Sequence, residues 1–316
     1  MTTREIYNLA IDLAVKADLR GTEKVEWYLS RLNDKFSKLS QEKKEEFDQE
    51  KLTNPYSDTR ILVDNQKSQI KKVLAGIDIG GAELLLADKL GDIDLVIAHH
   101  PDGSALADLH DVMQLQAQVL AGYGVPINIA ESVIKPRISE VARNVFSANH
   151  NRSVDMAKIL GLDFMCTHTT ADNLGARFLA DLLNKETDKL ETVGELLNLL
   201  KTISEYKEAL KTKGGIKLFT GHEDNSCGKI AVTEFTGGTS GSKDIYEKMA
   251  SAGIGTIIGM HMSEEHRKQA QKYHLNVVIA SHMASDSLGM NLFLDEVESK
   301  GVELVPISGL IRIKRQ

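Results

Sequence analysis

The sequence predicts an α/β protein with mostly parallel sheets, preceded by an all-helical arm. Two observations predict this class. From Lys71 onward, short apolar runs of strand length alternate with stretches of helical periodicity, and this alternation is typical of parallel sheets covered by helices. Before Lys71 the apolar residues recur at helical spacing, which indicates helices rather than a sheet.

The predicted arm comprises residues 1–70. Ile6, Leu9 and Leu13 share one face of a first helix, and residues 25–36 carry a second apolar stripe. Residues 41–51 are dense in mixed charge, which is typical of a solvated helix or its fraying end. Residues 54–58 read Asn-Pro-Tyr-Ser-Asp, a turn signal after which we expect a separate body.

The body should contain short strands separated by helices. The expected strands are residues 73–79, 93–98, 126–130, 164–167, 254–258 and 276–280. The expected helices are residues 105–123, 139–160, 190–213 and 263–273. Residues 216–220 and 229–235 resemble a pair of strands joined by a polar loop, and the basic residues 311–315 resemble a terminal strand.

Bulk composition excludes several classes of protein. The 316 residues suffice for one large domain or two moderate ones, and 42% of them are apolar. A net charge of −7 argues against nucleic acid as a partner, because phosphate backbones need a basic footprint. Two cysteines make no disulfide framework, and neither a signal peptide nor a membrane span is visible. We therefore expect a cytoplasmic protein that does not bind membranes.

Histidines follow three of the expected strands. His99 and His100 end the strand that begins near Ile93, at the edge where α/β sheets usually carry their ligands. His168 and His282 end two later strands, and each is followed four residues on by an aspartate, Asp172 or Asp286. A helical turn brings positions i and i+4 to one face, so each pair can aim at one spot.

This donor set is typical of a metal site. Mixed nitrogen and oxygen ligands suit zinc, manganese, iron or nickel. Neither Cys166 nor Cys227 belongs to a C-x-x-C pair, which argues against a structural zinc finger. The alternative interpretation is that the histidines are hydrogen-bonded capping groups of a metal-free protein.

Four motifs together resemble the Nif-three-like family, whose members are often described as GTP cyclohydrolase type 2 homologues. Residues 73–103 resemble its opening signature, a strand ending in Gly-Ile-Asp, a helix, and a strand ending in His-His-Pro. CTHTTAD (166–172) resembles its His-Thr-x-x-Asp motif, and IASHMASD (279–286) its Gly-His-x-x-x-Glu motif. TEFTGGTSGSKD (233–244) resembles the glycine-rich stretch between them. Order and rough spacing agree over residues 71–310.

The resemblance implies a fold of two interlocked α/β lobes with two divalent metal ions in the cleft between them. Residues 71–172 with 276–316 would form the lobe that carries most ligands, and residues 173–275 the second lobe. The implied ligands are His99, His100, Asp172, His282 and Asp286. Asp172 would bridge the metals, and His168 would help to orient the site. The family commonly assembles as a toroidal hexamer, so we expect a homo-oligomer.

Two features depart from the family pattern. Its last ligand is usually glutamate, and Asp286 is one methylene shorter. The N-terminal 70 residues match its opening poorly.

Two functions remain open from the sequence. The first is a dinuclear metal-dependent hydrolase that attacks a nucleotide-like or cyclic phosphate or purine substrate with a metal-bound water. No separate general base is obvious, so His168 or His266 could carry the proton. The second is a non-catalytic, ring-shaped scaffold or metal-handling protein. Residues 237–242 before a helical pattern could cradle an anion with backbone amides or form a flexible turn.

Overall fold

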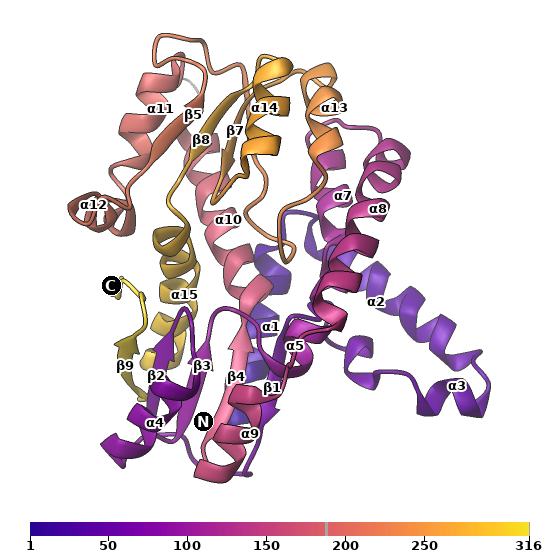
Figure 1. Ribbon diagram of the computed structural model, residues 1–316, viewed down its shortest axis with the longest axis vertical. Coiled ribbons are helices and arrows are strands. Elements are labelled where there is room, and N and C mark those ends of the chain that lie inside the picture. Colours follow the sequence, from indigo (N-terminus) through magenta and orange to yellow (C-terminus); the bar gives the residue numbers. More distant parts are fainter. Residues whose placement is uncertain (187–188, 316) are drawn as a thin grey trace.

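Two sheets occupy opposite ends of the molecule, and two long helices run between them (Figure 1). The computed structural model describes residues 1–186 and 189–315. The first sheet has the strand order β1-β4-β3-β2-β9 and the second the order β5-β8-β7-β6. Within each sheet one edge strand, β1 or β5, is antiparallel and every other pairing is parallel. The predicted α/β class, with two mostly parallel lobes, is confirmed.

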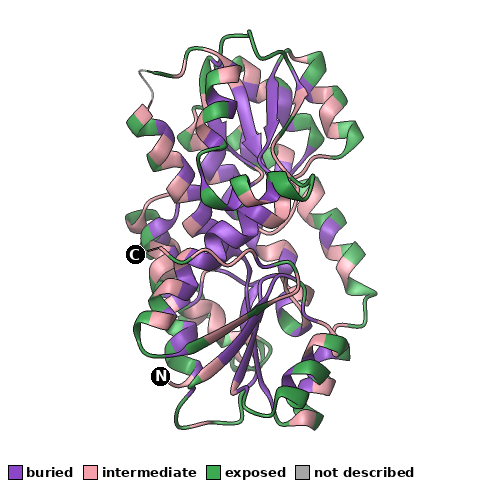
Figure 2. Cartoon of the chain, turned by 90° about the vertical axis from the view of Figure 1, so that its left-hand side faces the viewer, coloured by how far each residue is buried: buried purple, intermediate pink, exposed green. Residues whose placement is uncertain are grey.

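The strands have the following bounds. The first sheet consists of β1 (Thr59–Val63), β2 (Lys72–Gly76), β3 (Leu95–Ala98), β4 (Asp163–Thr167) and β9 (Glu303–Ile307). The second consists of β5 (Lys217–Thr220), β6 (Lys229–Val232), β7 (Ile254–Gly259) and β8 (Asn276–Ile279). Figure 2 shows that these strands are buried while the outer faces of the helices are exposed.

Helices cover both faces of each sheet. Those packed mainly on the first sheet are α1 (Thr3–Ala17), α4 (Gly81–Leu90) and α9 (Arg152–Leu160). The second sheet is covered by α7 (Gln114–Gly122), α8 (Ile127–Phe146), α11 (Val193–Leu200), α12 (Ser204–Lys211), α13 (Tyr246–Ser251) and α14 (Glu264–Lys272). The remaining helical elements are α2 (Thr22–Ser37), α3 (Gln41–Glu45), η1 (Gln49–Leu52), α5 (Gly103–Ala107), α6 (Leu109–Val112) and η3 (Lys243–Ile245).

The two central helices belong to both cores. Helix α10 (His168–Glu186) follows β4, and α15 (His282–Ser299) follows β8. Ala171 of α10 packs in the core of the first sheet, whereas Leu179 packs in the core of the second. In α15, Leu288 packs in the core of the second sheet and Phe293 in the core of the first. The lobes are therefore interlocked by two helices, each of which begins at one sheet and ends against the other.

The N-terminal region differs from the predicted all-helical arm. Its last segment forms β1, which pairs with β4 in register Thr59 with Thr167. Helix α1 is part of the body as well, because Ile6 and Ala10 are buried against the first sheet. Only α2 and α3 project outward (Figure 1). The short strand was missed because its Arg60 hides the apolar alternation.

Several predicted elements were also wrong. Residues 126–130 begin a helix, since Pro126 precedes its first turn and Ala130, Ile134 and Val141 bury one helical face. The segments 105–123, 139–160 and 190–213 are each divided into shorter helices. The strand pair 216–220 and 229–235 is not a pair, because β5 and β6 lie at opposite edges of the sheet. Residues 311–315 form no strand, and β9 was missed.

The predicted lobe boundaries also differ from the strand pairing. Strand β8, which was assigned to the first lobe, pairs with β7 and β5 in the second sheet. Helices α7 and α8, also assigned to the first lobe, pack on the second sheet. Hydrogen-bond partners of a strand are decided by tertiary contacts that periodicity does not record. Among the described residues, no helix combines the length and the apolar character needed to cross a membrane.

Candidate metal centre

The first two histidines extend from the carboxyl end of β3. Strand β3 lies between β2 and β4, with Ala98 opposite Gly76 and Cys166. The N–H of His99 donates to the carbonyl of Gly76 (2.9 Å), and the N–H of His100 donates to that of Ile77 (3.0 Å). Both histidines are thus held by the sheet rather than by a free loop.

The other ligands come from the first turns of the two central helices. His168 and Asp172 stand one turn apart at the start of α10, and His282 and Asp286 do so at the start of α15. The two helices share the pattern His-x-x-x-Asp-x-Leu-Gly. Helix α10 follows β4 directly, whereas α15 is preceded by Ser281 with φ +62°.

A close helix crossing brings the two aspartates together. Gly289, three residues after Asp286, lies against the backbone of Ala171, and a Cβ there would overlap the Ala171 carbonyl oxygen. Gly175, three residues after Asp172, faces Gly289 from the other helix. The glycines let the helix backbones touch, so the carboxylates one turn before them meet between the lobes.

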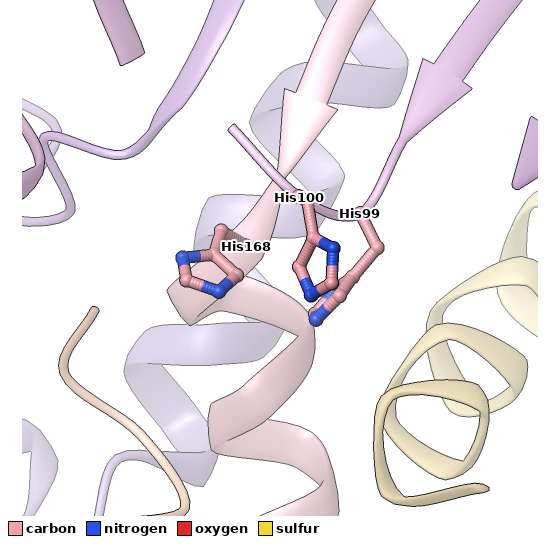
Figure 3. A group of neighbouring side chains, drawn as sticks. All are labelled: His99, His100 and His168. Atoms are coloured by element: carbon pink, nitrogen blue, oxygen red, sulfur yellow. The ribbon is translucent and has the colours of Figure 1, made fainter. Parts of the chain in front are cut away.

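Six side chains converge at this crossing. The Nε2 atom of His99 lies 3.4 Å from Asp172 Oδ1 and 3.6 Å from Asp286 Oδ1. Asp286 Oδ2 lies 3.6 Å from Nε2 of His100 and of His282. Nε2 of His168 lies 3.8 Å from Asp172 Oδ2. Figure 3 shows the rings of His99 and His100 at the end of β3, close to His168 at the start of α10.

The convergent atoms lack protein partners. His99 Nε2, Asp172 Oδ1 and both carboxylate oxygens of Asp286 are buried without a hydrogen bond. Buried polar atoms are almost always satisfied, and an unpaired buried carboxylate costs several kcal/mol. A cation at this point would satisfy all of them at once. The cluster could therefore hold a metal ion, and its nitrogen and oxygen donors fit one.

Three of the histidines are fixed by a second partner. Nδ1 of His100 contacts Asp78 Oδ1 at 2.6 Å, and Nδ1 of His168 contacts Asp58 Oδ2 at 2.8 Å. Nδ1 of His99 lies 3.3 Å from the Thr167 carbonyl. Metal-binding histidines are usually held in this way, because Nδ1–H donates a hydrogen bond to the partner oxygen, which fixes the tautomer and leaves the Nε2 lone pair free for a metal.

Burial and neighbouring charges set the protonation of the cluster. Burial lowers the pKa of His99 to about 4, so its ring is neutral at pH 7. Burial opposes protonation of His168 as well, but the carboxylates of Asp172, Asp58 and Asp286 raise its pKa to about 9. Burial also raises the pKa of Asp172 well above its ordinary value. Although burial acts against it, the surrounding imidazoles lower the pKa of Asp286.

A cavity of about 280 Å³ opens onto the cluster. Its walls include His100, His168, Asp172 and His282 on one side. The cavity is also lined by residues 234–235 after β6, by residues 236, 238 and 239 of the glycine-rich loop 236–241, and by residues 260–261 after β7. The cluster is therefore buried but reachable by a small molecule, and the His282 side chain is 38% exposed.

The structure brings all five predicted ligands and His168 into one cluster. His266 lies elsewhere, with its Nδ1 2.9 Å from the Tyr246 hydroxyl. His261 lines the cavity, and its ring centre is 4.9 Å from that of His282. The sequence analysis assigned no role to His261, although it follows β7 as His99 and His100 follow β3. Asp58 and Asp78 were not assigned as partners of histidines either; Asp78 ends the Gly-Ile-Asp signature.

Three solved structures similar to this chain can be compared with it, and the first of them shares its architecture. The crystal structure of a NIF3 superfamily protein from Sphaerobacter thermophilus has a TM-score of 0.79 and 27% sequence identity, covering 98% of this chain and 99% of that chain. Reduced HcgD from Methanocaldococcus jannaschii has a TM-score of 0.49 and 17% identity, covering 78% of this chain and 87% of that one. For a Bacillus cereus protein related to NIF3 the values are 0.37 and 12%, with coverage of 79% and 89%. No family model and no curated protein matches the chain.

Proposed function

Because the chain belongs to the NIF3 superfamily, as its motifs predicted, we propose that it is a dinuclear metal-dependent hydrolase. The observation that carries the proposal is the set of buried, unpartnered donor atoms on His99, Asp172 and Asp286 at the end of a ligand-sized cavity. A purely structural cluster would gain stability from pairing these atoms within the protein.

Each side chain has a distinct part in the proposed centre. His99, His100, Asp172, His282 and Asp286 would bind two divalent cations chosen from zinc, manganese, iron and nickel. Cations held there supply Lewis acidity and a hydroxide nucleophile at neutral pH. Asp172 lies between the imidazoles of His99 and His168, which suits a carboxylate shared by two cations.

His168 is the best-placed proton carrier. Its Nε2 faces Asp172 while its Nδ1 is held by Asp58, so the ring can exchange a proton at the cluster without turning. His266 is replaced in this role, because its ring contacts Tyr246 outside the cluster. The proposed substrate remains nucleotide-like or a cyclic phosphate or purine, and the proposed assembly is a homo-oligomeric ring.

The cavity favours catalysis over the alternative of a metal-bearing scaffold. A scaffold needs closed coordination, since a structural site gains nothing from an open face. Here His100 and His282 border a cavity of about 280 Å³. A substrate could therefore reach the side of the cluster that the protein leaves free.

Metal content and turnover test the proposal together. Protein purified without chelator should carry two metal ions per chain by mass spectrometry of the elements, and should turn over at least one member of a phosphodiester and GTP panel. The double variant His99→Ala, His100→Ala should lose both properties. The control His222→Ala alters an exposed loop histidine and should keep both. Metal without turnover in the wild type, with assembly lost on chelation, would instead support the scaffold.

A further inference from the structure

The glycine-rich loop of residues 236–241 forms the wall of the cavity that faces the histidine cluster. Thr236, Gly238 and Thr239 line the cavity together with His100 and His282. None of the described residues that line it is a lysine or an arginine. Because Glu234 and Asp172 also line it, an anion that enters the cavity must be held by backbone N–H groups, by hydroxyl groups, by imidazoles or by bound cations.

Side chains behind the loop turn its carbonyl groups away from the cavity. The buried side-chain amide of Gln116 on α7 donates to the carbonyl oxygens of Gly237 (2.8 Å) and Thr239 (2.6 Å). Arg137 donates to the carbonyl oxygen of Ser240 (3.1 Å). Gln116 does not line the cavity at the metal cluster but a separate apolar cavity on the other side of the loop. The loop thus presents its acceptors to the protein interior.

The same clamp turns two N–H groups of the loop away from Gln116. The peptide bonds are trans, so the N–H of each peptide points opposite to its carbonyl. The N–H groups of Gly238 and Ser240 share peptides with the two carbonyls held by Gln116. Neither N–H has an acceptor among the residues that the structure describes. Backbone N–H groups arranged in this way form anion-binding concavities.

The conformation of the loop is fixed rather than loose. Gly237 and Gly238 have φ values of +90° and +88°, which disfavour other residues at both positions. The Thr236 hydroxyl contacts Asn173 Oδ1 (2.5 Å), and the Ser240 hydroxyl contacts Nδ1 of His261 (3.0 Å). The N–H of Gly241 donates to Glu234. A preorganised loop binds an anion without losing conformational entropy at that moment.

We propose that the N–H groups of Gly238 and Ser240 form a subsite for a phosphate-like anion, opposite the histidine and aspartate cluster. The subsite rests on the proposed function in one respect: the anion is the non-reacting end of a substrate whose reacting bond lies at the cluster. About 280 Å³ is at the small end of ligand pockets. The subsite therefore selects a small phosphorylated molecule, with one phosphate at the loop, over a nucleoside polyphosphate.

Titration with inorganic phosphate tests the subsite. Gln116→Leu removes the clamp, whereas the control Gln114→Leu makes the same change at an exposed position of the same helix. By calorimetry of both metal-free and zinc-loaded protein, Gln116→Leu should weaken phosphate binding about tenfold, since two hydrogen bonds that orient the loop are lost. The control should bind within about twofold of the wild type. Equal affinities in the two variants would overturn the subsite.

Crystals of the wild-type protein soaked in tungstate give a second measurement that needs no variant. The anomalous peak should lie beside the N–H groups of Gly238 and Ser240. A peak confined to the histidine cluster, or to any other surface, would refute the subsite even if Gln116→Leu failed to fold. Metal content of the same samples separates the two proposals. If phosphate binds at the loop in protein that carries no metal, the subsite is supported and the hydrolase proposal is not. If the protein carries metal but Gln116→Leu does not weaken phosphate binding, only the hydrolase proposal is supported.

Discussion

The two halves of the molecule repeat one plan with different surroundings. In each sheet an antiparallel edge strand, β1 or β5, lies beside a parallel strand, β4 or β8. That parallel strand leads into a helix with the pattern His-x-x-x-Asp-x-Leu-Gly, α10 or α15. In each, the neighbouring parallel strand ends in histidine, at His99 or near His261, and the next strand is followed by an acid, Asp78 or Glu234. The repeat explains why the donors converge: the two helices cross at equivalent positions.

The halves differ in how tightly they hold their histidines. His168 of the first half is buried and paired with Asp58, and His99 and His100 also have Nδ1 partners. His282 of the second half is 38% exposed and faces the cavity. The first half therefore holds its imidazoles through Nδ1 partners, while the second contributes His282, the most exposed imidazole of the six-residue cluster.

The largest expected difference concerns His168 and His282. Breaking a buried ion pair leaves an uncompensated charge, so His168→Ala should lower the free energy of unfolding by about 4 kcal/mol. His282→Ala removes a partly exposed side chain and should cost less than about 1 kcal/mol. Urea denaturation of metal-free protein measures both. If Asp58→Asn does not reduce the cost of His168→Ala in a double-mutant cycle, the pair is not the cause.

The two helix-crossing glycines should also respond unequally. Gly289→Ala forces α15 away from the Ala171 carbonyl and should cost about 3 kcal/mol, with weaker metal binding because the aspartates separate. At Gly175 a Cβ would meet only ordinary contacts at 3.5 Å, so Gly175→Ala should be neutral or stabilise by up to about 1 kcal/mol. If Gly289→Ala and Gly175→Ala shift the unfolding midpoint equally, the helices do not cross more tightly at Gly289 than at Gly175.

The two aspartates should have opposite effects on the metal-free protein. The fold raises the pKa of Asp172, so the ionised carboxylate is disfavoured at pH 7 and Asp172→Asn should stabilise by about 1–2 kcal/mol. The fold lowers the pKa of Asp286, so Asp286→Asn should destabilise by a similar amount. Both variants should lose metal. Thermal unfolding of each variant, with and without chelator, measures its stability in the metal-bound and metal-free states. If the two metal-free variants shift the unfolding temperature in the same direction, the opposite pKa shifts of Asp172 and Asp286 are contradicted.

The smallest expected effect concerns the two acids that follow β2 and β6. Burial raises the pKa of Glu234 from 4.5 to about 7. The folded state then binds a proton more tightly than the unfolded state, so stability falls as pH rises from about 5 to 7. Glu234→Gln should remove this pH-dependent loss. Asp78→Asn leaves Glu234 in place, so its unfolding free energy should depend on pH as that of the wild type does. Unfolding free energies at pH 5, 6 and 7 decide between these outcomes.

The sequence predicted the side chains of the cluster more reliably than it predicted the residues that hold those side chains in place. His99, His100 and the two His-x-x-x-Asp segments are local patterns at strand ends, but their meeting was implied by the family resemblance and not by a shared sheet edge, since β8 lies in the other sheet from β3 and β4. Asp58 and Asn173 act on the site through contacts between segments about 110 or more residues apart or across lobes, which no local spacing reports. His261 could have been found by comparing the histidine after β7 with those after β3.

Fold errors have the same origin. The strands β3, β4, β7 and β8 were recognisable because nearly all their residues are buried and form apolar runs that stand out. Strands β1 and β9 lie at sheet edges, where polar residues such as Arg60 and Glu303 interrupt the pattern. Pro126 looked like the start of a strand, but it is the residue immediately before α8, and proline is common at the start of helices.

The pairing of Asp58 with His168 has a consequence for any shortened version of this chain. A truncation that started at β2 would retain every side chain expected to coordinate a cation, and would still be recognised by its motifs. It would nevertheless have lost the acid that holds one imidazole in place and the strand that shields it. The N-terminal stretch, whose sequence resembled the family motifs least, thus belongs to the architecture shared with the Sphaerobacter structure and supplies the acid that orients one imidazole of the cluster.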